Sequence, residues 1–136
     1  MFHLDPRLAK DSVELADWPL CRVRLMNDAN YPWLILVPER DGARDIIDLT
    51  PGDRAVLMTE IAAASQALAR LTKPDKLNVA ALGNVVAQLH VHIIARFTTD
   101  PAWPRPVWGV QPPKPYAAGA LDEFRRRFLS LVDRRS

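Results

Sequence analysis

The pattern of hydrophobic and polar positions predicts a β-hairpin near the start of the chain. Residues 20–26 alternate apolar and polar side chains, which is the period of a half-buried strand. Residues 33–37 form an unbroken apolar run that ends at Pro38, as expected for a central strand covered on both faces. Between them, residues 27–30 read Asn-Asp-Ala-Asn, a typical turn sequence.

A long helix is expected after the hairpin. Thr50 is a suitable N-cap, Pro51 would take the first helical position, and Asp53 would place a carboxylate in the first turn. The helix should end near Thr72, because Pro74 cannot continue it. Its buried stripe is expected to comprise Leu57, Ile61, Ala64, Leu68 and Leu71.

The remaining segments predict two further strands and two further helices. Strands are expected over residues 76–82 and 85–97. Six prolines between residues 101 and 115 exclude a helix or a central strand there. Apolar residues at helical spacing predict an amphipathic helix over 121–132, and Asp5-Pro6 could begin a short N-terminal helix.

Composition places the chain among ordinary globular proteins. It has 136 residues, 49% hydrophobic and 25% charged, which predicts a single domain over residues 1–136. The net charge of +2 is too small to predict nucleic-acid binding. Without a signal peptide or an apolar run near ~20 residues, no membrane association is expected, and the cytoplasm is the expected location. Cys21 is the only cysteine, so neither an internal disulfide nor a cysteine-rich zinc site can form.

The predicted strand over residues 85–97 separates apolar from polar side chains. Successive strand residues point to opposite faces, so the odd positions from 85 to 95, which are all apolar, should pack against a core. The even positions place Gln88, His90 and His92 in a row on the other face, each about 7 Å from the next. Because the chain has only three histidines, this row favours a functional site over a merely solvated strand surface.

Two kinds of chemistry suit this row of side chains. His90 and His92 could chelate a metal ion, which would require a third ligand from elsewhere in the chain. Alternatively, a neutral imidazole could attack phosphorus, while neighbouring polar side chains bind the phosphate oxygens. The strand pattern by itself leaves both open.

Residues 83–96, which read GNVVAQLHVHIIAR, resemble the signature of the histidine triad (HIT) superfamily. That signature is His-φ-His-φ-His-φ-φ, with φ apolar, after a loop that contains Gly and Gln. His90 matches the middle histidine and His92 the last, whereas Gln88 replaces the first, as in one bacterial branch. Asn84 stands where Gln is usual, and Val85 where Ser or Thr is frequent.

Other segments extend this resemblance over residues 18–100. Residues 26–38 resemble the hairpin of the family, and Asp48-Leu49-Thr50 before the long helix also fits. The stretch from 100 to 109 resembles the tail of the same branch, which approaches the site; the alternative is a proline-stiffened surface loop that Trp103 and Trp108 anchor. Residues 101–136 would then comprise this Pro/Trp-rich segment and the C-terminal helix.

The resemblance implies an α+β fold with a mainly antiparallel sheet of about five strands, one long helix, a C-terminal helix and a two-fold homodimer. It implies a hydrolase or transferase acting on the α-phosphate of a dinucleoside polyphosphate or nucleoside phosphoramidate. The intermediate would be a nucleotidyl-His90, with no metal or other cofactor required and a nucleotide as the small-molecule partner. The implied catalytic residues are His90, His92 and Gln88, and the implied nucleotide-binding residues are Asn27, Asp28, Asn78, Gly83 and Asn84.

Two other functions remain compatible with the sequence. An incomplete triad suits a nucleotide-binding or interaction module with little turnover. The second possible function is metal binding by His90 and His92. Formation of a covalent adduct on His90 would separate the enzyme from both.

Overall fold

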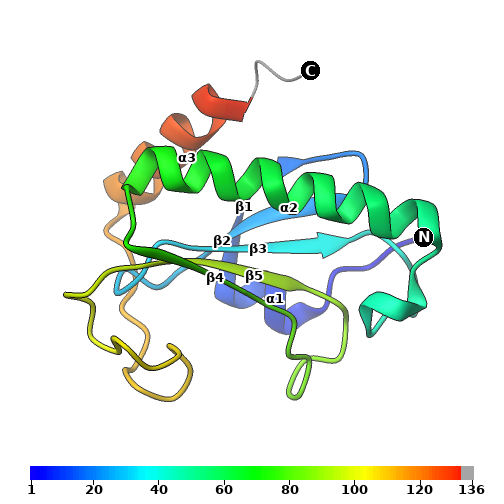
Figure 1. The fold of residues 1–136 in the computed structure, drawn as a ribbon, viewed down its shortest axis with the longest axis horizontal. Helices are drawn as coiled ribbons and strands as arrows, with labels where there is room; N and C mark the ends of the chain where they lie inside the picture. The colour runs from blue at the N-terminus through cyan, green and yellow to red at the C-terminus, as the bar shows by residue number, and fades with distance from the viewer. Residues whose placement is uncertain (133–136) are drawn as a thin grey trace.

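Five strands form one antiparallel sheet in the computed structural model, which describes residues 1–132 (Figure 1). Their order across the sheet is β1-β2-β3-β5-β4. The strands are β1 (Ser12–Asp17), β2 (Cys21–Met26), β3 (Trp33–Pro38), β4 (Lys76–Ala80) and β5 (Val91–Arg96). The helices are α1 (Pro6–Asp11), α2 (Pro51–Thr72) and α3 (Ala118–Val132), and Ile46–Asp48 form a 3-10 turn, η1. This is the α+β architecture that the sequence predicts.

The predicted hairpin and the long helix form as expected. β2 pairs antiparallel with β3. The Thr50 hydroxyl accepts a hydrogen bond of 3.1 Å from the Asp53 N–H, which caps the start of α2. The helix ends at Thr72, and Lys73 then turns the chain in a left-handed conformation with φ of 52°.

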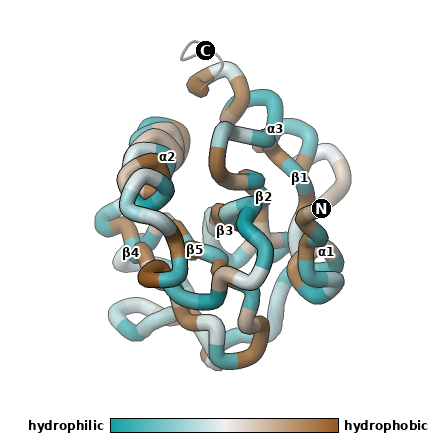
Figure 2. Tube along the Cα trace, turned by 90° about the vertical axis from the view of Figure 1, so that its right-hand side faces the viewer, coloured by the Kyte–Doolittle hydropathy of each residue, from teal (hydrophilic) through white to brown (hydrophobic). Residues whose placement is uncertain are grey.

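The helices α2 and α3 cover one face of the sheet, and α1 with irregular segments covers the other. In Figure 2, α2 lies over the β4 and β5 side of the sheet, and α3 lies over the β1 and β2 side. A large apolar core fills the space between these helices and the sheet. On the opposite face, Trp33, Ile35 and Ile94 pack with Leu8 of α1 and with Val107 from the proline-rich segment. The residues of β3 and β5 are therefore buried on both faces of the sheet.

The predicted strand over residues 85–97 is wrong in its first half. β5 begins at Val91, and the residues before it form a loop in which Val85 is 81% exposed. An alternating sequence forms a strand only where a neighbouring strand pairs with it, and the pairing between β3 and β5 ends at Val91. Within β5 the predicted alternation is confirmed: the odd positions join the core under α2, and the even positions face the other way.

Three further boundaries differ from the sequence prediction. β1 was not predicted, because a register shift between Glu14 and Ala16 disrupts its alternation. β4 ends at Ala80, two residues early, where the chain leaves the sheet. α3 starts at Ala118, ahead of the apolar stripe on which the prediction relied. Of the described part of the chain, no helix is both long and apolar enough to cross a bilayer.

Candidate active site

His90 lies at the end of the loop that leads into β5, and its ring is held in one orientation. Its Nδ1 lies 2.7 Å from the backbone carbonyl oxygen of Gln88. A carbonyl can only accept a hydrogen bond, so the neutral ring carries its proton on Nδ1 and has a free lone pair on Nε2. The side chain is largely buried, with 7% exposure. This arrangement leaves Nε2 available as a nucleophile.

His92 is held in the opposite tautomer. The indole Nε1–H of Trp33 donates to His92 Nδ1 over 3.0 Å, and an indole can only donate. Neutral His92 therefore carries its proton on Nε2. Burial, and secondarily repulsion from the neighbouring His90 ring when that ring is protonated, lowers the pKa of His92 to about 3. His92 is consequently a neutral hydrogen-bond donor at physiological pH, with its ring centroid 4.8 Å from that of His90.

Aromatic rings enclose His92. Trp108 packs edge-on against it with ring centroids 5.0 Å apart, and Trp33 lies 5.6 Å away. Trp108 also contacts Trp33 at 5.7 Å while remaining 37% exposed, so it separates His92 from solvent. The proline-rich segment thus reaches His92 through Trp108.

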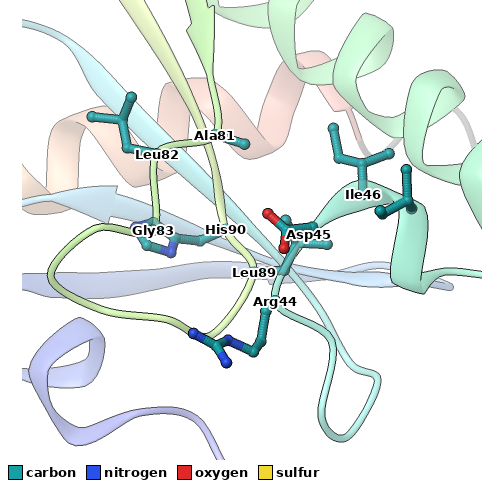
Figure 3. Close-up of a pocket in the computed structure, with 9 residues that line it drawn as sticks. Arg44, Asp45, Ile46, Ala81, Leu82, Gly83, Leu89 and His90 are labelled. Atoms are coloured by element: carbon teal, nitrogen blue, oxygen red, sulfur yellow. The ribbon is translucent and has the colours of Figure 1, made fainter.

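A cavity of about 290 Å³ adjoins His90 (Figure 3). Figure 3 shows His90, Gly83 and Leu82 on one side of it and Asp45 and Ile46 on the other. Its lining residues come from the segment around η1 and from the loop between β4 and β5: Arg44, Asp45, Ile46, Ile47, Ala81, Leu82, Gly83, Leu89 and His90. Gly83 has φ of +71°, a conformation that favours glycine. The volume is at the small end of the range for ligand sites.

Arg44 gives this cavity a positive group. None of the ion pairs among residues 1–132 involves Arg44. Asp45, the carboxylate beside it, belongs to the capping box of η1 together with Asp48. A guanidinium outside any ion pair, in the same cavity as His90, suits an anionic ligand, since guanidinium groups bind phosphate oxygens well.

Gln88 does not present a free amide to the cavity. Its Nε2 donates to the carbonyl oxygen of His3 over 2.8 Å, and its Oε1 accepts from the Asp5 N–H over 2.8 Å. Both ends of the side chain are therefore engaged by the N-terminal segment. Gln88 contributes to the surroundings of His90 through its backbone carbonyl.

Of the predicted nucleotide-binding residues, the structure brings Gly83 beside His90, and Asn84 follows it in the same loop. Each of the other three has one side-chain oxygen that accepts a hydrogen bond within the protein. Asn27 Oδ1 accepts from the Tyr116 N–H over 2.9 Å, and Asp28 Oδ1 from the Lys114 N–H over 3.2 Å. Asn78 Oδ1 accepts from Arg96 over 2.8 Å.

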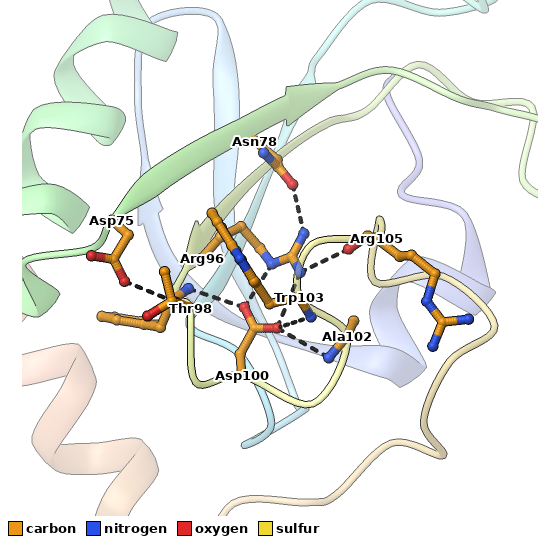
Figure 4. Close-up of polar contacts among 9 residues, drawn as sticks. Asp75, Asn78, Arg96, Thr98, Asp100, Ala102, Trp103 and Arg105 are labelled. Carbon is orange, nitrogen blue, oxygen red and sulfur yellow. Dashed lines mark hydrogen bonds and ion pairs between the residues drawn. The ribbon is translucent and has the colours of Figure 1, made fainter.

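A buried ion pair stabilises the segment after β5 (Figure 4). The Arg96 guanidinium donates to Asp100 at 2.8 and 3.1 Å, and to the backbone carbonyl of Arg105 at 2.8 Å. Arg96 also lies over the rings of Tyr31 and Trp103. Burial alone would raise the pKa of Asp100, but hydrogen bonds from Arg96 and three backbone N–H groups outweigh it and lower that pKa.

Sequence reasoning missed Trp33, Arg44 and the contacts of Arg96. Trp33 could be placed on a strand, but its approach to His92 depends on the pairing of β3 with β5, in which Ile35 lies opposite His92. Arg44 falls in a charged stretch without periodicity. The even spacing of Arg96 from His92 was the one available signal that it shares the face of the histidines.

Comparisons with known proteins agree with this geometry. The family model of the HIT domain matches residues 7–99. A histidine triad protein from Bradyrhizobium japonicum has 52% identity and a TM-score of 0.95, covering 96% of this chain and 98% of its own. One from Marinobacter aquaeolei VT8 has 45% identity and a TM-score of 0.96, covering 100% and 99%. One from Sinorhizobium meliloti 1021 has 43% identity and a TM-score of 0.94, covering 96% and 97%. No curated protein matches the chain.

Proposed function

Because the chain belongs to the HIT domain family, we propose that it is a nucleotide hydrolase or nucleotidyl transferase that forms a covalent nucleotidyl-His90 intermediate. The observation that carries this proposal is the bond from His90 Nδ1 to the Gln88 carbonyl, which leaves Nε2 free beside a cavity. A covalent intermediate replaces one difficult displacement at phosphorus by two easier ones.

The reaction proceeds in two steps. His90 Nε2 attacks the α-phosphorus; a P–N bond forms, and the leaving group departs with the electron pair of its own bond to phosphorus. Water then attacks the same phosphorus and releases a proton to solvent, and His90 leaves as imidazole. His92 donates its Nε2–H to a phosphate oxygen, and Arg44 with the backbone around Gly83 binds the anionic groups.

The surroundings of His90 favour a leaving group that departs as an anion. Gln88 has no acidic proton to give and both ends of its amide are engaged. His92, with a pKa of about 3, is a neutral imidazole at neutral pH and does not carry the second proton that an acid would donate. A phosphate leaving group needs no proton from the protein, whereas an amine does. We therefore expect dinucleoside polyphosphates to be better substrates than phosphoramidates.

Asn27, Asp28 and Asn78 stay candidate nucleotide-binding residues in this proposal. One side-chain oxygen of each accepts an internal hydrogen bond, but the Asn27 and Asn78 amides keep their N–H donors and Asp28 keeps its second carboxylate oxygen. The apolar side chains of the cavity, among them Ile46 and Leu82, offer a surface for an uncharged part of the substrate.

Acid-free quenching followed by mass spectrometry tests the covalent step. Protein mixed with a dinucleoside polyphosphate should carry one nucleotidyl mass on the peptide that contains His90, and His90→Ala should carry none and lose turnover by at least about 10³-fold. Nucleotide binding without adduct or product would instead identify a binding module. An adduct on any other residue, or turnover retained in His90→Ala, would refute the mechanism.

Substitution of Arg44 tests the anionic part of the site. Arg44→Ala should raise KM for the dinucleoside polyphosphate about tenfold, because one charge-assisted contact to phosphate is lost. The matched control is Arg127→Ala, which removes an exposed arginine from α3. Equal KM values in the two variants would exclude Arg44 from substrate binding.

We also infer a two-fold dimer in which β4 of one protomer pairs with β4 of a second copy. β4 is an edge of the sheet, and its Val79 side chain is 50% exposed. An edge strand that offers unpaired backbone groups and an apolar side chain is suited to strand pairing, and a two-fold axis makes the contact self-complementary. Sedimentation should show a dimer that Val79→Lys converts to a monomer; a monomeric wild-type protein would contradict this inference.

A further inference from the structure

Gln88 connects two segments that are far apart in the sequence. Its carboxamide bonds the backbone of His3 and Asp5, each at 2.8 Å, across 85 and 83 positions of the chain. One side chain thus satisfies a backbone acceptor and a backbone donor of the N-terminal segment. Paired donor and acceptor contacts of this kind define the relative position of two segments more closely than a single bond would.

A second contact strengthens this junction. Arg7 donates through one terminal nitrogen to the carbonyl oxygen of Val85 over 3.1 Å. Its remaining nitrogens bind the carboxylate of Asp5, whose side chain also caps α1 by accepting from the Arg7 N–H. Residues 3–7 and 85–88 are therefore joined at three points, on the side of the loop that immediately precedes His90.

The same residue, Gln88, also sets the state of the nucleophile. Its backbone carbonyl accepts the hydrogen bond from His90 Nδ1 at 2.7 Å. Residues 84–88 are outside the sheet, and the Leu89 N–H of the same peptide group donates to the Ala43 carbonyl over 3.0 Å. That bond fixes the side of Leu89, and the contacts of the Gln88 side chain with the N-terminal segment fix the side of Gln88. Irregular loops open at low free-energy cost unless such contacts tie them down.

We propose that Gln88 is a positioning residue whose carboxamide latches residues 3–5 onto the loop and thereby holds its own carbonyl against His90 Nδ1. This latch, rather than contact with substrate, is what the residue at the first position of the triad contributes in this protein. The inference about the latch is structural, and its consequence for the rate rests on the proposed function.

The latch leads to an unexpected outcome for the variant that restores the complete triad. Gln88→His gives up the planar carboxamide, whose oxygen and nitrogen are spaced for the two backbone groups. An imidazole has one donor and one acceptor in a different geometry. We therefore expect Gln88→His to form the His90 adduct more slowly than the wild-type protein, although its sequence is closer to the full triad.

Three substitutions of Gln88 measure the rate consequence in single-turnover experiments with a dinucleoside polyphosphate. Gln88→Ala should lower the rate of adduct formation about 10- to 100-fold, as is usual when a group that orients a reactive residue is lost. Gln88→Glu keeps the acceptor for Asp5 but sets a carboxylate oxygen against the His3 carbonyl, so its rate should also fall. The half-saturating substrate concentration should stay within about threefold in all variants, because no substrate contact is removed.

A matched pair at Asp5 isolates the backbone N–H from the side chain. Asp5 has φ of −55°, which proline adopts, so Asp5→Pro suits the backbone torsion while its ring Cδ replaces the N–H and displaces Gln88 Oε1. Asp5→Ala loses the same carboxylate but keeps the N–H. Gln88→Ala should therefore cost a larger factor in the Asp5→Ala background than in the Asp5→Pro background. Equal factors would mean that the Gln88 side chain and the Asp5 N–H are not energetically coupled.

Hydrogen exchange tests the latch without reference to activity. In Gln88→Ala the Asp5 amide should exchange at least about tenfold faster. The Ala95 amide of β5, which donates to the Pro32 carbonyl just before β3, is the internal control and should be unchanged. Unchanged protection of Asp5, or a Gln88→His rate above that of the wild type, overturns the latch. Absence of any adduct in the wild-type protein, with Asp5 protection still lost in Gln88→Ala, would refute the proposed function and leave the latch intact.

Discussion

The two faces of the sheet bury their side chains by different means. Beneath α2, β3 and β5 contribute apolar groups such as Leu34, Leu36 and Ile93, which pack against Leu68 and its neighbours. The opposite face buries His92 and Arg96 alongside aromatic rings, under segments that are mostly irregular. The same two strands thus supply the main core on one side and the candidate active site on the other.

This difference shows where specific partners are needed. Burial of apolar side chains is non-directional: it depends on the surface removed from water, so a helix can cover this face without specifically placed partner atoms. A buried polar group requires a partner at hydrogen-bond distance, or its desolvation costs free energy. The face under α2 has one such group in Glu60, which accepts from the Leu20 and Cys21 amides at 3.0 and 2.9 Å. The opposite face has several buried polar groups, among them His92 and Arg96, each with a hydrogen-bond partner.

The largest effect is expected from breaking the ion pair on the site face. Arg96→Met leaves Asp100 charged and buried, so unfolding free energy should fall by about 4 kcal/mol in urea titration. The double variant Arg96→Met/Asp100→Asn removes the unpaired charge and keeps an acceptor for the backbone amides, and should recover part of the loss. If the unfolding free energy of Arg96→Met were less than about 1 kcal/mol below that of the wild type, the ion pair would not be what stabilises this face.

A truncation under the helix should affect stability and leave the chemistry unchanged. Leu68 is fully buried, and Leu68→Ala should lower the unfolding free energy by about 3 kcal/mol through lost burial and the cavity left behind. The rate of His90 adduct formation per folded molecule should stay within about twofold of the wild type, since no group near His90 changes. A larger change of rate would mean that the two faces are coupled.

The pH dependence of stability distinguishes the faces through His92. Its folded-state pKa of about 3 is below the unfolded value of 6.5. The unfolded state therefore binds a proton that the folded state excludes, and stability present above pH 6.5 is lost as pH falls from 6.5 toward 3. Between about pH 7.5 and 5 the wild type should lose about 2 kcal/mol more than His92→Gln, which cannot titrate and retains an acceptor for Trp33. If the unfolding free energies of the wild type and His92→Gln changed equally with pH, folded His92 would not have the lowered pKa.

The smallest effect on stability, with a clear effect on rate, is expected at Trp33. Trp33→Phe removes the donor to His92 Nδ1, so the ring can adopt either tautomer and adduct formation should slow about tenfold. Unfolding free energy should fall by about 1 kcal/mol. Trp18→Phe is the control, because Trp18 stacks on Phe128 in the core under the helices. Equal rates in the two variants would show that the tautomer of His92 is unimportant.

The sequence by itself determined the elements whose signals are local. The cap and proline at the start of α2, the apolar stripe along it and the alternation within β5 all depend on neighbouring residues, and the structure confirms them, with Leu71 at the end of the stripe only partly buried. The resemblance of residues 83–96 to the HIT signature likewise identified the family, which the family model confirms, and it predicts His90 and His92 as site residues.

Only the tertiary structure decided what surrounds the two histidines. The tautomer of His92 depends on Trp33, 59 positions away, and the engagement of Gln88 depends on His3 and Asp5, more than 80 positions away. Val85 belongs to an alternating sequence yet lies in an exposed loop, because no strand pairs with it there. Hydrogen bonds between segments are short-range and directional, so they arise only once the fold has brought the partners together.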